Sequence, residues 1–138
     1  KWISKKGNFF GSIFFPLKKN FPSVSEFTLI NPMLNIDVLS NHCEVKNLFF
    51  KSPNDIYINR KKVCGILQET ILMESKKYLI VGIGINILSS PKIKNYPVTN
   101  LYKETRKKIK LAKIVNEIKN IYEHFFLPLV VIKQYGFN

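Results

Sequence analysis

The pattern of apolar and polar positions along the chain predicts a sheet built from consecutive strands. Short runs that alternate or are nearly continuously apolar cover residues 44–50, 56–59, 62–73 and 78–88. Only short connections separate them. Turn-forming residues are expected to close hairpins near Arg60–Lys61 and at 74–77. Sequential strands joined in this way favour an antiparallel meander.

A further strand and two helices are expected around this meander. The aromatic run NFFGSIFF at 8–15 predicts a buried strand, in which Gly11 marks a bulge or a close approach. Ser23 and Glu26 match a capping box, and the next apolar positions are spaced as in a helix. These positions are Phe27, Ile30, Leu34 and Val38. Because Pro32 lies among them, we expect this helix to kink or to start later.

The most regular helical spacing lies near the end of the chain and predicts a helix over 109–126. Residues 89–100 read as a loop between the last strand and this helix. The sequence therefore predicts an α+β fold, a mainly antiparallel sheet with helices packed on one face.

Length and composition indicate one domain with a real core. The chain has 138 residues, of which 46% are apolar. No apolar run reaches the length that crosses a bilayer, and no signal-peptide pattern is present. Cys43 and Cys64 lack a metal-ligand spacing, so we expect reduced thiols and a cytoplasmic location. Because the chain begins with Lys1 rather than methionine, we expect a piece of a longer protein.

The chain carries a strong positive charge, with 22 Lys and Arg against nine Asp and Glu and a formal net charge of +13. Such a surface attracts polyanions. The basic residues are nearly all lysine and are scattered among Asn, Ile and Phe, which favours a biased genome composition as the source of much of this charge. A surface that binds polyanions stays open as the alternative.

The segment KSPNDIYINRKKVCGILQE, residues 51–69, concentrates the candidate chemistry. Pro53-Asn54-Asp55 suits a plain turn, and Lys62 suits an edge strand that must avoid aggregation. Four blocks in order argue for more: KWISKKGNFFGS, KSPND, KKVCGILQE and VGIGIN. Together they resemble the catalytic domain of biotin protein ligases over residues 1 to about 88.

This resemblance implies a class II aminoacyl-tRNA-synthetase-like biotin/lipoate ligase domain, present here in part. It implies ATP and biotin as substrates, with Mg²⁺ accompanying ATP, and a biotin carboxyl carrier domain as protein partner. Biotin would be converted to biotinyl-AMP and then transferred to a carrier lysine. Lys62 matches the family's catalytic lysine, where an ammonium can join two anions. Asp55 matches the aspartate that orients or deprotonates the carrier lysine.

The resemblance also assigns binding residues. Trp2 matches the tryptophan that stacks on adenine, and Asn54 and Asn86 match positions near the adenylate. The remaining matches line the biotin slot, where glycine lets the backbone approach the ligand. They are Gly65, Leu67, Gly82 and Ile83.

The chain departs from the family pattern in three ways. Ser52 replaces a tryptophan, and a buried Ser52 would leave a costly hole. The family's Gly-Arg-rich loop lies before the first matched block, and its small SH3-like β-barrel lies after the catalytic domain. We therefore expect a partial catalytic domain over 1–126, N-terminally truncated, and a tail over 127–138 without the barrel.

Other functions remain as alternatives at this stage. A basic module could bind single-stranded nucleic acid by stacking bases on Phe9, Phe10, Phe49 and Phe50, although neighbours in a strand face opposite ways. A lipoate protein ligase shares the implied fold and adenylate chemistry. The lysine-rich stretch KETRKKIKLAK reads as a solvated helix face or as a docking surface for an acidic carrier domain. A homodimer is compatible with the resemblance, and no membrane association is expected.

Overall fold

The computed structural model describes residues 6–126 and 131–134, and it confirms the predicted α+β fold. The described strands form a six-stranded sheet in the order β2-β3-β4-β5-β1-β6. Its strands are β1 Phe9–Pro16, β2 Leu48–Lys51, β3 Asp55–Ile58, β4 Lys61–Met73, β5 Lys76–Ile85 and β6 Val131–Gln134. Every pairing between them is antiparallel, so the predicted meander from β2 to β5 is confirmed.

Two tight turns join β3 to β4 and β4 to β5. Asn59 and Arg60 have φ values of 50° and 66°, and Glu74 and Ser75 have 49° and 67°. Two successive residues with positive φ match the two-residue hairpin turns whose twist suits neighbouring strands. The first turn therefore lies one residue earlier than Arg60–Lys61, because β4 already begins at Lys61.

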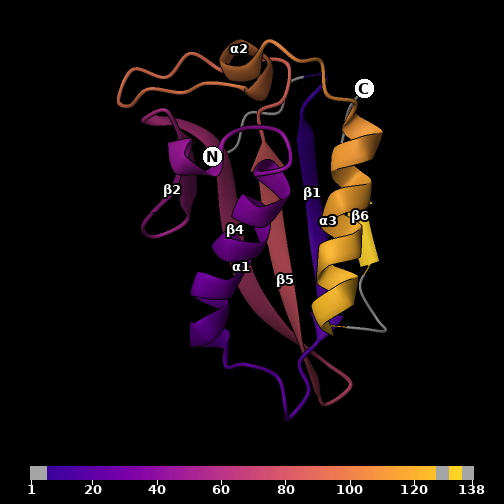
Figure 1. The fold of residues 1–138 in the computed structure, drawn as a ribbon. Helices are drawn as coiled ribbons and strands as arrows, with labels where there is room; N and C mark the ends of the chain where they lie inside the picture. The colour runs from indigo at the N-terminus through magenta and orange to yellow at the C-terminus, as the bar shows by residue number, and fades with distance from the viewer. Residues whose placement is uncertain (1–5, 127–130, 135–138) are drawn as a thin grey trace.

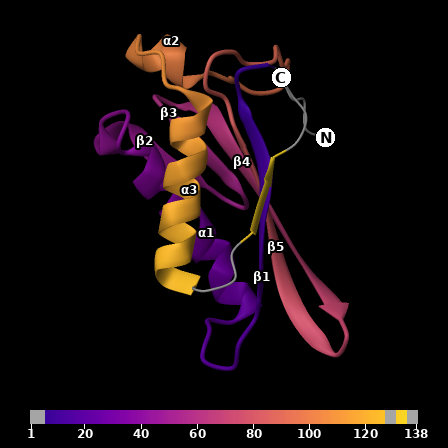
Figure 2. The same cartoon turned by 90° about the vertical axis from the view of Figure 1, so that its right-hand side faces the viewer.

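Two long helices, α1 Val24–Leu39 and α3 Leu111–Phe126, cover one face of the sheet (Figures 1 and 2). The predicted capping box is present: the amide of Glu26 donates to Ser23 Oγ, and the amide of Ser23 donates to Glu26 Oε1. The helix starts there and keeps Pro32 in its interior, so the expected later start is wrong. The capping box therefore sets the first residue of α1 at Val24.

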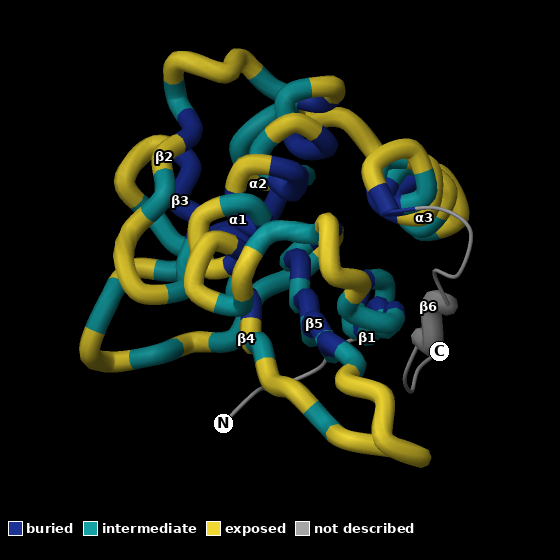
Figure 3. Tube along the Cα trace, turned by 90° about the horizontal axis from the view of Figure 1, so that it is seen from below, coloured by how far each residue is buried: buried dark blue, intermediate teal, exposed yellow. Residues whose placement is uncertain are grey.

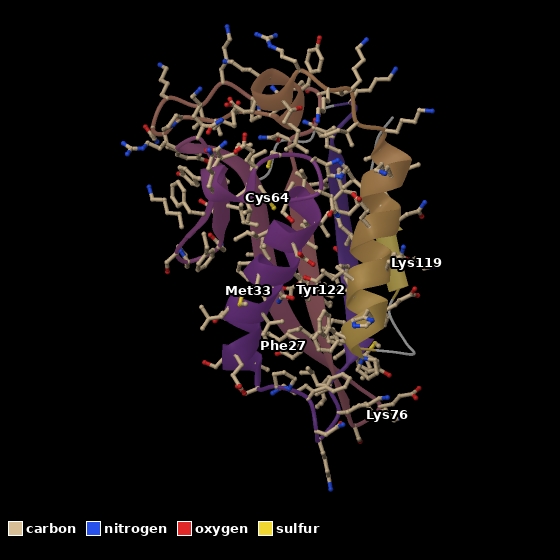
Figure 4. All side chains as sticks on the ribbon, viewed as in Figure 1. Phe27, Met33, Cys64, Lys76, Lys119 and Tyr122 are labelled. Atoms are coloured by element: carbon tan, nitrogen blue, oxygen red, sulfur yellow. The ribbon has the colours of Figure 1, made fainter. Side chains whose placement is uncertain are left out.

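The core lies between the helices and the sheet (Figure 3). Phe15 of β1 stacks on Phe126 of α3, with ring centroids 5.0 Å apart, and lies 5.6 Å from Phe27 of α1. Figure 4 shows Phe27 and Tyr122 in this layer. Burial of these large rings supplies much of the hydrophobic stabilisation of the fold.

Two asparagines occupy positions of α1 that face the core. Asn31 and Asn35 are both fully buried. The Tyr122 hydroxyl donates to Asn31 Oδ1 at 2.9 Å and accepts from Asn35 Nδ2 at 3.2 Å. Asn31 Nδ2 donates in turn to Gln68 Oε1 at 2.7 Å. This chain of bonds ties α3 through α1 to β4, and burial raises the pKa of the Tyr122 hydroxyl, which therefore stays protonated.

Three elements differ from the sequence-based expectation. The predicted strand at 44–50 begins only at Leu48, because the 3₁₀ turn η1, Val45–Asn47, precedes it. A short helix, α2 Leu101–Thr105, follows the predicted loop, and Asn100 caps it by accepting from the amide of Lys103. The expected tail contains β6, which pairs with β1. None of the helices in the described part of the chain is long and apolar enough to cross a membrane.

The register assigns side chains to the two faces of the sheet. Ile66 opposes Ile83, and Cys64 opposes Ile85, on the face that α1 and α3 cover. The intervening positions of β4, β5 and β1 point to the other face, which no described helix covers (Figure 2). We call this the open face.

Candidate active site

A bulge in β4 places Lys62 on the open face. Ile56 opposes Cys64, but Tyr57 opposes Lys62, so Val63 is an extra residue in the ladder. Strict alternation from Gly65 would turn Lys62 towards the helices, and the extra residue reverses this. Val63 and Cys64 are accordingly both buried, although they are neighbours in the strand.

Lys62 forms an ion pair with Asp55 across the β3–β4 hairpin. Lys62 Nζ lies 3.0 Å from Asp55 Oδ1, and each side chain is 24% exposed. The ammonium also lies 5.3 Å from the ring centre of Tyr96. The two candidate catalytic residues are therefore in direct contact, with an aromatic ring beside the cation.

Glycines form the floor next to this pair. Gly65 of β4 lies directly opposite Gly84 of β5, and Gly82 lies opposite Leu67. A Cβ at Gly65 would be 3.5 Å from Lys62 Nζ, and a Cβ at Gly82 would be 3.7 Å from the Leu67 carbonyl oxygen. Both distances are ordinary contacts, so the protein itself would accept alanine here. The glycines instead keep the open face low enough for another molecule to approach the backbone.

Residues from four segments line a pocket around the ammonium. They include Lys62 and Gly65 of β4, Gly84 of β5, Asn86, Tyr96, and Asn8 and Phe10 near the start of β1. A second hollow on the open face is lined by Phe10, Ser12, Leu67 and Gly82, among others. The glycine floor joins the two, since Gly82 and Gly84 are alternate residues of β5.

Residues 96–104, which we call the cap, close one end of this pocket. The Lys62 amide donates to the Pro97 carbonyl at 3.0 Å, and the Thr99 amide donates to the Lys62 carbonyl at 2.8 Å. Asn86 Nδ2 donates to the Thr99 carbonyl at 3.1 Å. The cap therefore lies beside the strand end that carries Lys62 and against the residue that follows β5.

Glu104 holds the cap to the β3–β4 turn. Its carboxylate accepts from the Thr99 hydroxyl and, at 2.8 Å, from Asn59 Nδ2, and Lys61 Nζ lies 3.6 Å away. Burial alone would raise the pKa of Glu104, but the hydrogen bonds from Thr99 and Asn59 and the charge of Lys61 outweigh it and lower the pKa. Glu104 is therefore ionised at neutral pH.

Asn8 fixes the chain that follows β5. Its Oδ1 accepts from the amides of Ile87, Leu88 and Ser89, and its Nδ2 donates to the Ser89 carbonyl at 2.9 Å. One buried amide thus satisfies a turn of backbone directly after Asn86.

The structure brings together most, but not all, of the predicted site residues. Leu67 and Gly82 lie on the open face, whereas the side chain of Ile83 is fully buried in the core on the other face. Asn54 lines a third hollow, between α1 and β4, rather than the pocket around Lys62. Trp2 lies outside the described residues.

Two other expectations change with the structure. Ser52 is exposed, so its replacement of a tryptophan leaves no buried hole. Of the aromatic pairs proposed for stacking bases, Phe9 is buried and Phe50 opposes the core residue Ile56. Phe10 and Phe49 remain on the open face with three strands between them, which is a poor stacking platform.

The thiol of Cys64 adds no nucleophile to the site. Cys64 is buried, and burial is the main cause that raises the pKa of its thiol, which is therefore a poor nucleophile at neutral pH. Within residues 6–126 and 131–134, no group of three or more His, Cys, Asp or Glu side chains is placed to hold a metal ion.

Sequence reasoning missed Thr99, Glu104 and Asn8. A signal for Glu104 was present: residues 89–113 contain eight Lys or Arg and this single acid. Figure 4 shows many nitrogen-tipped side chains around α2. A lone carboxylate in such a segment has cations and amides available as partners.

Comparison with known proteins gives a consistent picture. The sequence model of the biotin/lipoate A/B protein ligase family matches residues 1–86. A biotin–[acetyl-CoA-carboxylase] ligase of Paracoccus denitrificans is 28% identical over 93 residues, which cover 66% of this chain and 39% of that protein. The chain thus spans about two fifths of this relative's length.

Two solved structures share the fold. The biotin protein ligase of Leishmania major in complex with biotinyl-5-AMP has a TM-score of 0.72 at 28% identity, over 87% of this chain and 55% of that chain. The Aquifex aeolicus enzyme in complex with biotin and ATP has a TM-score of 0.65 at 32% identity, over 91% and 54%.

Proposed function

The chain belongs to the biotin/lipoate A/B protein ligase family, and from this premise we propose that it carries the site at which biotin is adenylated. Biotinyl-AMP formed there is then used to modify a lysine of a biotin carboxyl carrier domain. The observation that carries the proposal is the Lys62–Asp55 pair beside a glycine floor on the open face. ATP and biotin are the substrates, and Mg²⁺ accompanies ATP.

Lys62 promotes the first step by bringing two anions together. A carboxylate oxygen of biotin attacks the α-phosphorus of ATP, the bond to the leaving phosphate breaks, and pyrophosphate departs. Both reacting groups are negative, and their repulsion opposes the attack. An ammonium between them reduces that repulsion, and its effect grows as charge shifts in the transition state. The partly buried position of Lys62 strengthens this interaction because water screens it less.

Asp55 serves the second step. The incoming carrier lysine is a cation in water and must lose a proton before it can attack. Asp55 accepts this proton, and the neutral amine attacks the biotinyl carbonyl. AMP leaves with the electrons of the broken C–O bond, and the nitrogen loses its second proton to water. In the structure, Asp55 is paired with Lys62 at 3.0 Å. Asp55 therefore becomes available as a base when the anions of the adenylate attract the ammonium.

The open face holds the two substrates side by side. Biotin lies over Gly65, Gly82 and the exposed side chain of Leu67, where the backbone can be approached closely. The nucleotide lies in the pocket around Lys62 and Asn86, whose carboxamide is already oriented by Thr99. Ile83 supports this floor from the core side. Trp2 keeps its proposed role of stacking on adenine, whereas Asn54, which lines the hollow between α1 and β4, is not assigned to the adenylate.

A matched pair of lysine variants tests the proposal. In the full-length gene product, Lys62→Ala should lower biotin-dependent ATP–pyrophosphate exchange by about a hundredfold or more, the typical loss when an electrostatic group is removed. The control is Lys76→Ala, at the far hairpin and exposed (Figure 4). It should behave as the parent does. Exchange by Lys62→Ala at the parental rate would rule out the proposed role.

The acyl substrate is tested separately, because the family description includes lipoate. Biotin and lipoate compete for adenylation in the same exchange assay. Selective turnover of biotin is expected, as the Paracoccus relative carries the biotin name. Selective turnover of lipoate would instead indicate a lipoate ligase that uses the same adenylation chemistry.

A further inference from the structure

Thr99 joins the two proposed adenylation residues, Lys62 on β4 and Asn86 directly after β5. It is fully buried, and each of its polar groups has a different partner. Its amide donates to the Lys62 carbonyl, its carbonyl accepts from Asn86 Nδ2, and its hydroxyl donates to Glu104. A shift of Thr99 would therefore displace the Lys62 backbone and the Asn86 side chain together.

Glu104 determines where Thr99 lies. Its side chain is 9% exposed, so its charge is costly unless donors surround it. The donors come from separate segments: Thr99 from the cap, Asn59 from the β3–β4 turn and Lys61 from the start of β4. The carboxylate thus holds the cap against the hairpin that carries Lys62.

We propose that Glu104 is a positioning residue for biotin adenylation, which acts through Thr99 on Lys62 and Asn86. The inference rests on the function proposed above. A catalytic ammonium works only within a narrow range of positions, and a displacement of about 1 Å can cost a hundredfold in rate. The cap also carries Tyr96 next to this ammonium. Loss of the Glu104 charge therefore loosens both the backbone and the aromatic neighbour of Lys62.

A pair of carboxylate variants in the full-length gene product separates positioning from general stability. Glu104→Gln keeps size and one acceptor oxygen but removes the charge. Its matched control is Glu117→Gln on α3, where the carboxylate lies 2.5 Å from His42 Nε2 and 3.2 Å from Asn41 Nδ2, away from the pocket. We expect Glu104→Gln to lower kcat for biotin-dependent ATP–pyrophosphate exchange between about tenfold and a hundredfold, with the KM for biotin nearly unchanged.

The control should keep the parental kcat even if its melting temperature falls equally. Equal kcat in the parent and in Glu104→Gln would overturn the proposal. So would a loss of kcat that Glu117→Gln reproduces at the same loss of melting temperature.

Variants of Thr99 test whether Glu104 affects kcat through Thr99. Thr99→Val removes the hydroxyl at nearly constant shape and should reproduce the kcat loss of Glu104→Gln. Thr99→Ser restores the hydroxyl and should recover most of the rate. The double variant Thr99→Val/Glu104→Gln should lose no more than Glu104→Gln alone, because both changes disrupt the Thr99–Glu104 interaction. Additive losses would contradict action through Thr99.

Amide hydrogen exchange distinguishes this inference from the proposed function. The Lys62 and Thr99 amides form the hydrogen bonds between β4 and the cap, and they should exchange faster in Glu104→Gln than in the parent or in Glu117→Gln. If the parent shows no biotin-dependent ATP–pyrophosphate exchange, the proposed function is wrong, independently of the amide hydrogen exchange rates. If the parent is active but the Lys62 amide is equally protected in Glu104→Gln, only the positioning role is wrong.

Discussion

On the helix-covered face of the sheet, Ile66, Ile83 and Ile85 are buried beneath α1 and α3, whereas the alternate positions on the open face include Gly65, Gly82 and Gly84. The same two strands thus present large side chains to one layer and bare backbone to the other. Burial on the first face contributes stability. Glycines on the second contribute none, and in a strand each costs about 0.5–1 kcal/mol relative to alanine. The glycines of the open face therefore lower the stability of the sheet and leave space above its backbone.

The largest expected effect lies on the covered face. Phe15→Ala removes a fully buried ring that packs on Phe126 and Phe27, and should cost about 3–5 kcal/mol in the free energy of unfolding. Urea denaturation measures this loss. The comparison is Phe10→Ala, a phenylalanine of the same strand that lies on the open face. It should lower the free energy of unfolding by less than half as much. Equal losses would mean that the two faces do not differ as described.

A polar change on the covered face should have an intermediate effect. Tyr122→Phe leaves Asn31 Oδ1 and Asn35 Nδ2 each without one bond in a buried place, which costs about 1–3 kcal/mol. The control is Tyr78→Phe on the open face, a half-buried ring that stacks on Phe14. It should stay within about 0.5 kcal/mol of the parent in the same urea assay. A silent Tyr122→Phe would show that the buried network contributes nothing to stability.

The cap should give a pH-dependent effect. The pKa of Glu104 lies below its ordinary value of 4.5 in the folded protein, so its ionised form stabilises the fold above that pH. The stability difference between the parent and Glu104→Gln should be constant at neutral pH and should shrink as the pH falls below 4.5. Urea denaturation at a series of pH values measures it. A difference that grows towards acid would have the wrong sign.

The smallest effect on stability is expected for a glycine of the open face. Gly65→Ala adds a Cβ that meets Lys62 at an ordinary contact distance of 3.5 Å and should stabilise the protein by about 0.5 kcal/mol. Biotin binding, measured by calorimetry, should nevertheless weaken. A clear loss of stability would mean that the fold, and not a ligand, requires glycine at this position.

Local rules predicted much of the fold. The capping box at Ser23, the hairpin at 74–77 and the helix ending at Phe126 follow from turn chemistry and periodicity within a few residues. The α2 helix was missed because five residues give no periodicity to detect. The burial of Asn31 and Asn35 was missed because it depends on a tyrosine far along the chain.

The candidate site was predicted only in part. The resemblance identified Lys62 and Asp55, which the structure brings into contact. It could not reveal the bulge at Val63, which arises from pairing with β3 and decides the face on which Lys62 lies. Thr99 and Glu104 escaped notice because their roles depend on tertiary contacts with Lys62 and Asn59.

The central claim is that the open face, and not the covered one, receives biotin. Gly82 and Ile83 are neighbours in β5 and point to opposite faces, so they form the most direct test. Biotin binding is measured by calorimetry for Gly82→Val and Ile83→Val in the full-length gene product. We predict that Gly82→Val raises Kd at least about tenfold, a cost of about 1.4 kcal/mol, while Ile83→Val stays within about twofold of the parent. The reverse order, or equal affinities, would contradict the account.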